Sequence, residues 1–385
     1  MPAEISNIQG GGTVEELTIT SNGTYNPPTG IDGFAPVVVN VPQDGAPTAE
    51  DLTFSGDCSR MFANNRWVQI LKKYGNLFNF VNVTDASYMF YRSTELEKLP
   101  TLNFNNSYAI TNYMFQDCAY LKECPDIRNL RFGSLKGAFS NMRSVREIPD
   151  SFVDNNDFAY GHLNFSGSAT PAYDEMFDSC RSLRRITPKI FQMLYPKVSY
   201  SNSIYRYGFS YCNNLEELTN LPCFDQSTWT SNAFFVCFDD CNRLGRVVFS
   251  TNEDGTPKVV QWQYQTIDLH GAGFCSQANE QYILQQNSGI TADKAVYNDA
   301  EYQALKNNPD WYARNANYSR YNHDSAVETI NSLPDTSAYL ASAGGTNTIK
   351  FTGSYGAKTD GGAINTLTEE EIAVATAKGW TVSLV

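Results

Sequence analysis

The chain has 385 residues, of which 42% are hydrophobic and 18% are charged, and its formal net charge is −13. The apolar fraction suffices for a packed core and excludes a disordered chain, and the excess of acid argues against nucleic acid as a partner, because phosphate backbones repel an acidic protein. No run approaches the roughly 20 apolar residues that cross a bilayer, so we expect no membrane insertion, and the opening MPAEISNIQGGG lacks the basic and apolar regions of a secretory signal.

The first predicted elements lie in the stretch EELTITSNGTYNPPTGIDGFAPVVVNVP, residues 15–42. Apolar and polar residues alternate on both sides of a turn rich in Pro and Gly, which predicts short β-strands. The stretch is similar to short β modules of phage tail and other virion structural proteins. This resemblance implies that residues 1–46 form a small all-β module that attaches the chain to other virion proteins and takes part in oligomerisation.

A repeated phrase follows, aligned on a phenylalanine that recurs at intervals of 24 to 38 residues. The third residue after this Phe is Cys in four copies, and the sixth and ninth residues are apolar in all seven. Recurrence at this spacing is typical of a solenoid, in which no unit can bury its apolar side alone. The predicted repeat core comprises Phe62, Phe90, Phe115, Phe139, Phe177, Phe209, Phe238, Cys118, Cys180, Cys212, Cys241, Leu96, Leu121, Leu183, Leu215 and Leu244.

Within each unit, steps of three residues place Phe, the third residue and the following Leu on one side of a tight helical turn, as in a 3₁₀ helix. The residues after this Leu alternate, as in LEELTNL (Leu215–Leu221), which predicts a short strand stacked on that of the next unit. The nine cysteines are odd in number and include no C-x-x-C, so we expect buried reduced thiols at a tight inner corner. The sequence therefore predicts an α/β solenoid with a short strand and a helical turn per repeat.

The repeated phrase resembles the leucine-rich repeats of BspA-like bacterial surface proteins. VTDASYMFYRSTELEKL (Val83–Leu99) follows that pattern with Ser93 where Cys is usual, and ITNYMFQDCAYLKECPDI (Ile110–Ile127) follows it with the Cys. Departures are the long intervals after the fourth and fifth Phe, and Ala138, Gly208 and Cys237 in place of the second Met. The resemblance implies a leucine-rich-repeat array over residues 50–275.

Residues 276–385 read as an irregular segment followed by helix–strand units that cap the array. Ser325–Leu333 has a helical pattern and Thr346–Gly353 a strand pattern. Thr368 and Glu371 have the spacing of a helix capping box, and WTVSLV then reads as a final strand. This closing unit is similar to those of such repeat proteins in gut bacteria and their phages.

The longest intervals hold segments rich in Tyr, Asn and Ser, at Asp154–Glu175 and Leu194–Phe209, and Asn308–His323 has a similar composition. Insertions in repeat arrays often emerge on the binding face, and aromatic rings beside amides and hydroxyls suit sugars or protein surfaces. These side chains could equally shield the edge of the array. The candidate ligand contacts are Tyr160, Tyr173, Tyr195, Tyr200, Tyr205, Tyr207, Trp311 and Tyr312.

No constellation of residues indicates catalysis, a cofactor or a metal. His162, His270 and His323 lack metal-ligand spacing, and no nucleophile-elbow, zinc-protease or phosphate-loop motif occurs. The 41 carboxylates leave a pair of catalytic acids open. The oxygen-rich DNND at Asp154–Asp157 lacks the EF-hand pattern, and a bound calcium ion also stays open.

We therefore expect a non-enzymatic phage virion structural protein, whether tail fibre, head fibre or decoration protein. Its leucine-rich repeats would bind a host-surface or mucosal glycan or protein, and analogy with phage fibres suggests a homotrimer. The alternative is a BspA-like adhesin of the bacterial cell surface. A virion-borne glycan depolymerase is the third reading.

Overall fold

The computed structural model describes most of the repeat region and the C-terminal units. The described residues are 15–18, 23–25, 37–40, 52–65, 67–157, 174–191, 206–221, 223, 234, 236–241, 243–270, 272, 274–275, 318–319, 321, 323–351 and 367–385.

Two pairs of short parallel strands lie at the N-terminal end. β1 (Glu15–Thr18) pairs with β3 (Val37–Asn40), and β2 (Gly23–Tyr25) pairs with β4 (Leu52–Asp57). β2 thereby forms the edge of a five-stranded sheet in the order β2-β4-β5-β6-β7. Strand pairing therefore joins the N-terminal segment to the array across residues 46–50, where the sequence suggested a domain boundary.

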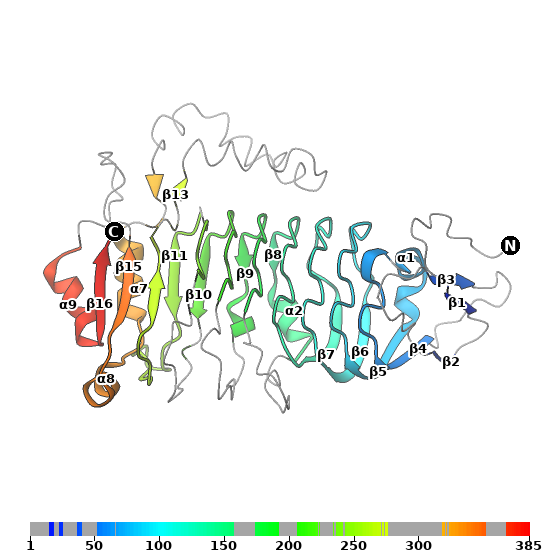
Figure 1. The fold of residues 1–385 in the computed structure, drawn as a ribbon, viewed down its shortest axis with the longest axis horizontal. Coiled ribbons are helices and arrows are strands. Elements are labelled where there is room, and N and C mark those ends of the chain that lie inside the picture. Colours follow the sequence, from blue (N-terminus) through cyan, green and yellow to red (C-terminus); the bar gives the residue numbers. More distant parts are fainter. Residues whose placement is uncertain are drawn as a thin grey trace.

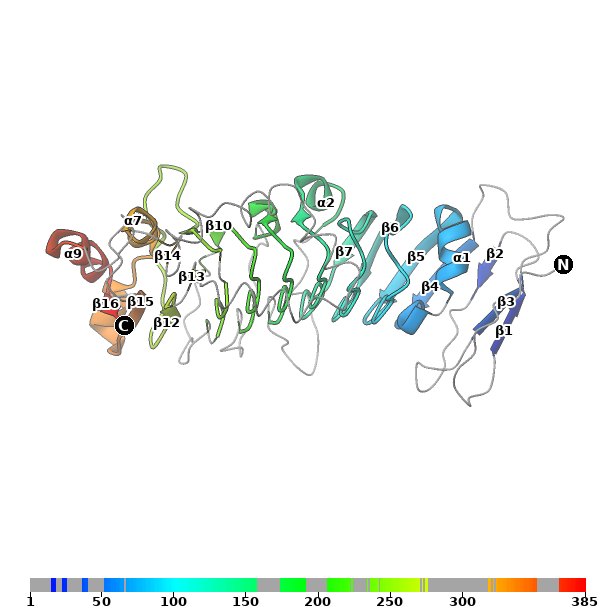
Figure 2. The same cartoon turned by 90° about the horizontal axis from the view of Figure 1, so that it is seen from above.

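Successive strands of the array pair in parallel. The pairs are β4 to β7 in the first sheet, then β8–β9, β10–β11 and the sheet β12-β15-β16, whereas β13 and β14 are antiparallel. Because neighbouring strands share a direction, the chain makes one turn per repeat and advances along the long axis (Figure 1 and Figure 2). The strand bounds are β5 Phe78–Asp85, β6 Leu102–Ala109, β7 Ile127–Phe132, β8 Glu147–Ile148, β9 Arg185–Ile186, β10 Glu217–Leu221, β11 Arg246–Phe249, β12 Thr266–Asp268, β13 Phe274–Cys275, β14 Tyr318–Ser319, β15 Asn347–Phe351 and β16 Trp380–Leu384.

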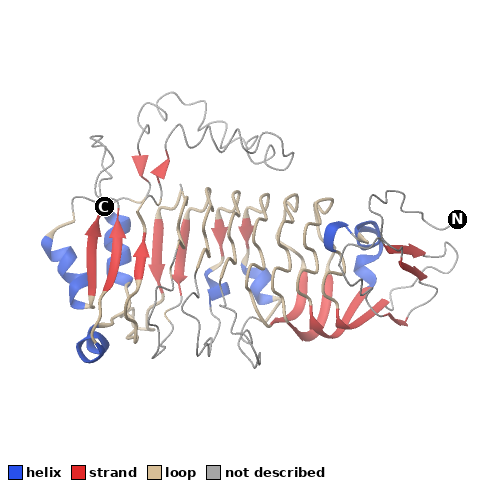
Figure 3. Ribbon diagram, in the orientation of Figure 1, coloured by secondary structure: helices blue, strands red, loops and turns tan. Residues whose placement is uncertain are grey.

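Helices occupy only some of the coils, and Figure 3 shows that most of the path between strands is loop. Their bounds are η1 Ala63–Asn65, α1 Val68–Tyr74, η2 Gly75–Leu77, α2 Asp150–Asp154, η3 Pro188–Phe191, α7 His323–Ser332, α8 Ser337–Ala343 and α9 Glu369–Ala377.

The turn around each repeat Phe is not the helical turn that the spacing suggested. At Phe115, the N–H of Cys118 donates to the Phe115 carbonyl at 3.1 Å and the N–H of Leu121 to the Cys118 carbonyl at 3.2 Å. These bonds span three residues, as in a 3₁₀ helix, but Tyr113 and Asp117 have φ of 56° and 62°. Since a 3₁₀ helix needs negative φ throughout, the expectation of helical turns is wrong here. The period of three comes from consecutive tight turns that contain left-handed residues.

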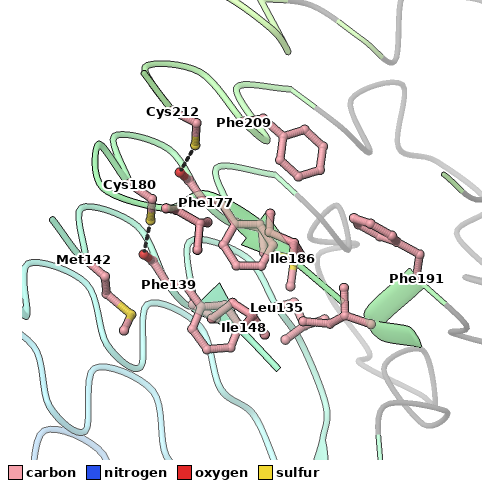
Figure 4. Packing of buried hydrophobic residues seen from close by; sticks show 14 of the residues in the cluster. Leu135, Phe139, Met142, Ile148, Phe177, Cys180, Ile186, Phe191, Phe209 and Cys212 are labelled. Carbon is pink, nitrogen blue, oxygen red and sulfur yellow. Dashed lines mark hydrogen bonds between the residues drawn. The ribbon is translucent and has the colours of Figure 1, made fainter. Parts of the chain in front are cut away.

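The seven repeat phenylalanines form one continuous stack in the core. Each is at most 2% exposed, successive ring centroids are 5.0 to 6.1 Å apart, and the rings are within 14° of parallel. Figure 4 shows the rings of Phe139, Phe177 and Phe209 one above another. Burial of one Phe stabilises the fold by about 2–3 kcal/mol, so this column is a principal source of the array's stability.

Backbone hydrogen bonds also join successive coils, and the longer intervals do not interrupt them. The N–H of Phe115 donates to Ala138 across a 24-residue interval, and that of Phe139 donates to Met176 across a 38-residue interval. The distances are 2.9 and 3.0 Å. The turns therefore stay in register whatever the length of chain between them.

The cysteine column has a hydrogen-bonding role in addition to its packing role. Four thiols each donate to the carbonyl of the Phe in the preceding coil, at 2.9 to 3.1 Å, and Figure 4 marks two of these bonds. Ser93 makes the same bond with its hydroxyl to Phe62, at 2.6 Å. Eight cysteines among the described residues are free thiols. The four donors are Cys118, Cys180, Cys212 and Cys241.

The C-terminal units form as the sequence predicted. The Thr368 hydroxyl accepts the N–H of Glu371 and the Glu371 carboxylate accepts the N–H of Thr368, so the capping box is confirmed. The predicted helix and two strands are confirmed as α7, β15 and β16. Lys378, after α9, donates to the carbonyls of Ile330 and Asn331 and so ties this unit to the C-terminal end of α7.

Candidate binding surface

The positions on either side of each repeat Phe form a set that we call the turn ridge, and four of its members are buried: Ala63, Gly137, Ser140 and Ser210. It comprises the side chains two residues before, one residue after and two residues after each repeat Phe. The first set is Arg60, Tyr88, Tyr113, Gly137, Glu175, Tyr207 and Val236; the second is Ala63, Tyr91, Gln116, Ser140, Asp178, Ser210 and Asp239; the third is Asn64, Arg92, Asp117, Asn141, Ser179, Tyr211 and Asp240.

The first and third sets all have left-handed backbone conformations, with φ between 52° and 62°. This conformation costs about 1–2 kcal/mol for an ordinary residue, whereas Gly, Asn and Asp tolerate it. Four of these positions nevertheless carry tyrosine: Tyr88, Tyr113, Tyr207 and Tyr211. Bulky residues held in this region are typical of functional sites, so the ridge is the candidate binding surface.

Tyrosines and cations stack along the N-terminal half of the turn ridge. The Arg60 guanidinium lies 5.1 Å from the centroid of the Tyr88 ring, which stacks on Tyr113 at 5.1 Å and 21°. The Lys136 ammonium lies 5.9 Å from the Tyr113 centroid. Gly137 leaves room for this ring, because a Cβ there would lie 2.2 Å from Cδ1 of Tyr113. The two rings therefore cover each other's faces, and the Tyr113 hydroxyl donates to Glu175 Oε2 at 3.4 Å.

Two partly exposed cations converge on one buried carboxylate near the middle of the ridge. The Asp174 side chain is 0% exposed and accepts bonds from Nε and Nη2 of Arg206, both at 2.9 Å. Lys136 Nζ lies 3.2 Å from Asp174 Oδ2. The bond to Asp174 raises the pKa of Arg206. Since these residues come from three consecutive coils, they join the coils of Phe139, Phe177 and Phe209.

Acidic side chains gather at the C-terminal half of the ridge. Burial raises the pKa of Asp178 to about 6 and raises the pKa of Asp240. Asp239 and Asp240 are exposed, and the charge of Asp239 raises the pKa of Tyr211, whose side chain is 41% exposed. This end of the ridge therefore presents negative charge around an exposed aromatic ring.

The sequence-predicted ligand contacts are mostly outside the described residues. Of the eight, the structure describes only Tyr207, which is half-buried on the ridge with the Arg206 guanidinium 5.7 Å from its ring centroid. Sequence reasoning missed Tyr88, Tyr113 and Tyr211. Their fixed offset of two residues from a repeat Phe was a usable signal, but reading it requires knowing that these offsets are left-handed.

The histidines and acids considered in the sequence do not form a metal site in the described part of the chain. It contains no group of three or more His, Cys, Asp or Glu side chains placed to hold a metal ion. His323 bonds to Glu371 at 3.1 Å, His270 is exposed, and His162 lies outside the described residues. Asp154, at the start of the oxygen-rich stretch, pairs with Lys189 at 2.8 Å. No described helix has the length and apolar character needed to span a bilayer.

The resemblance to BspA-like repeats rests on the repeat residues themselves. Comparison of the chain with models of protein families, with curated proteins and with solved structures found no match.

Proposed function

We propose that this chain is a non-enzymatic structural protein of a phage virion, with a leucine-rich-repeat solenoid that binds a host-surface or mucosal glycan or protein. Its position would be that of a tail fibre, head fibre or decoration protein. The N-terminal segment would attach it to other virion proteins, and many weak contacts would add up through copy number.

One observation carries the binding role: the inner columns of the array repeat, whereas the outer columns do not. The core position holds Phe in all seven coils, all of them buried. Two residues later the coils present Asn, Arg, Asp, Asn, Ser, Tyr and Asp in turn. A constant core with a varied surface is how repeat arrays serve as recognition scaffolds.

The N-terminal segment supports the virion setting through its resemblance to phage β modules. Parallel pairing of β2 with β4 extends the array's sheet into that segment. A module joined to the array by strand pairing would hold it in a defined direction relative to an attachment point. The proposal therefore includes a location in the virion, with the N-terminal segment as the point of attachment.

Two other functions compete with this one. A bacterial cell-surface adhesin would use the same array without a virion. A glycan depolymerase would need paired carboxylates in a cleft, and the acids of the turn ridge lie on an outer surface, with Asp239 and Asp240 exposed.

Mass spectrometry of purified virions tests the setting, and we expect peptides of this chain among the structural proteins. Incubation of the full chain with bacterial cells and with immobilised mucin tests binding, with unbound protein measured after sedimentation. Peptides found only in bacterial envelopes would favour the adhesin, and new reducing ends on the glycan would show an enzyme.

A further inference from the structure

An exposed tyrosine lies just before β12, outside the turn ridge. Tyr264 is 51% exposed, and its φ of 58° is left-handed, a conformation that a bulky residue rarely adopts. Its backbone N–H donates to the Thr346 carbonyl at 3.0 Å, which ties it to the start of β15. The fold therefore holds a large ring at the surface on a strained backbone, and such strain is typical of functional sites.

A glycine makes room for this ring. Gly345 lies between α8 and β15 (Figure 1) and has a φ of 90°. A Cβ at this position would lie 3.2 Å from Cε1 and from Cζ of Tyr264, closer than side chains ordinarily approach. The Tyr264 ring therefore packs beside bare backbone, which only glycine provides.

Amide and hydroxyl groups lie next to the ring. The same Cβ would lie 3.3 Å from Nε2 of Gln263, whose Oε1 accepts the Tyr339 hydroxyl at 3.2 Å. Gln261 is exposed on the outward side of the same segment, because burial alternates there with the fully buried Trp262. These amides supply donors and acceptors of hydrogen bonds. We call Gln261, Gln263, Tyr264, Tyr339 and Gly345 the Tyr264 patch.

The sequence around the Tyr264 patch is uncharged. Residues 259–267 and 336–349 contain no Asp, Glu, Lys or Arg, although 18% of the chain is charged. Asp335, just before α8, accepts bonds from the N–H and Oγ of Ser337 at 2.9 and 2.6 Å. A ligand with many hydroxyl groups can therefore bind here without removing water from an unpaired charge.

We propose that the Tyr264 patch binds an uncharged pyranose sugar of a glycan. The C–H face of the sugar would cover the Tyr264 ring, whose face carries partial negative charge, and the sugar hydroxyls would bond to the amides of Gln261 and Gln263. Protein partners are held by several aromatic or Arg anchors, and the single exposed ring favours a sugar. The proposal rests on the glycan-binding role proposed above and names the class of sugar and its contact.

Affinity electrophoresis of the full chain tests the proposal, with dextran and galactomannan as uncharged polysaccharides and polygalacturonate as an acidic one. We expect at least one uncharged polymer to slow the protein. Polygalacturonate should not slow it, because the chain's net charge of −13 repels an acidic polymer. Tyr264→Asn removes the ring but suits the left-handed backbone, so this variant should fold and bind roughly tenfold more weakly. Tyr264→Trp keeps an aromatic face and should retain binding.

The matched control is Tyr120→Asn, which replaces a half-buried tyrosine outside the Tyr264 patch and the turn ridge and should leave binding unchanged. No retardation by either uncharged polymer, stronger retardation by polygalacturonate, or a Tyr264→Asn variant that binds like the unaltered protein would each overturn the proposal. So would mucin binding that depends on Tyr264 but survives chemical removal of the mucin glycans, since the ligand would then be protein. None of these results alters detection of the chain in virions, so the two proposals fail separately.

Discussion

At the scale of single residues, the cysteine column shows how a small polar bond selects a residue type. Each thiol in the column packs in the core and donates to the carbonyl of the preceding coil's Phe. Sequence alone predicted the burial, because an unpaired Cys is among the most buried residue types. The bond could not be predicted from sequence, since its acceptor lies one whole coil away.

Substitution of Cys212 separates the bond from the packing. Cys212→Ser keeps a donor for the Phe177 carbonyl, as Ser93 does for Phe62, whereas Cys212→Ala removes it. We expect the alanine variant to lose about 1–2 kcal/mol of unfolding free energy and the serine variant about half of that. Urea titration measures both, and a serine variant less stable than the alanine variant would contradict the bond.

Asp178 gives stability a dependence on pH. Burial raises its pKa to about 6, above the roughly 3.9 of an unfolded Asp. The folded state therefore binds more protons between pH 4 and 6, so stability falls as pH rises through this window and stays lower above it. Asp178→Asn should stabilise the protein by about 1 kcal/mol at neutral pH, after discounting for solvent, and by nothing near pH 3.5. An equal effect at both pH values would contradict this cause.

At the scale of elements, the sequence predicted several strands and helices but not the conformation of the turn at each repeat Phe. The positions of β10, β15, β16, α7 and the capping box follow from local alternation and spacing. The conformation of the turn could not be predicted in this way, because hydrogen bonds from residue i to i+3 give the same period in a 3₁₀ helix and in consecutive tight turns. The sign of φ separates the two, and Tyr at a left-handed position gives no hint of it. The pairing of β2 with β4 was also unpredictable, since it joins segments across an expected linker.

Tyr211 tests whether the turn keeps tyrosine at a cost to stability. Its φ is 57° and its side chain is 41% exposed. Tyr211→Gly relieves the left-handed strain, so we expect the unfolding free energy to be unchanged or raised by up to about 1 kcal/mol. The control Tyr120→Gly changes a tyrosine outside the set with positive φ, and it should lose about 1 kcal/mol. A destabilised Tyr211 variant would mean that the ring serves packing instead.

At the scale of the whole molecule, the array is a one-dimensional stack in which each coil contacts its neighbours. From recurrence of the phrase the sequence predicts a leucine-rich-repeat solenoid, because units that cannot bury their apolar side alone must stack, and that assignment stays a prediction. The sequence alone did not predict the turn ridge, because Arg60 and Asp240 are far apart in the chain and belong to one row of turns only when the coils are stacked.

Phe139 tests the stack at its middle. Phe139→Ala should cost about 3–5 kcal/mol and should uncouple the coils on either side, since stability in such arrays passes through nearest neighbours. Hydrogen exchange should then show two blocks of amides with separate opening free energies. Phe62→Ala, at the end of the stack, should loosen only the first coils. A single uniform loss of protection in the Phe139 variant would argue for a globular core.

The hydrogen bond from the Phe139 N–H to the Met176 carbonyl keeps the turns in register although 38 residues separate Phe139 from Phe177. The number of residues between two repeat Phe residues therefore does not set the spacing between their turns. A foreign peptide inserted between Asp157 and Asp174 would leave the stacked turns in place. Insertions of different sequence and length can therefore be exchanged at this position, in evolution or by design.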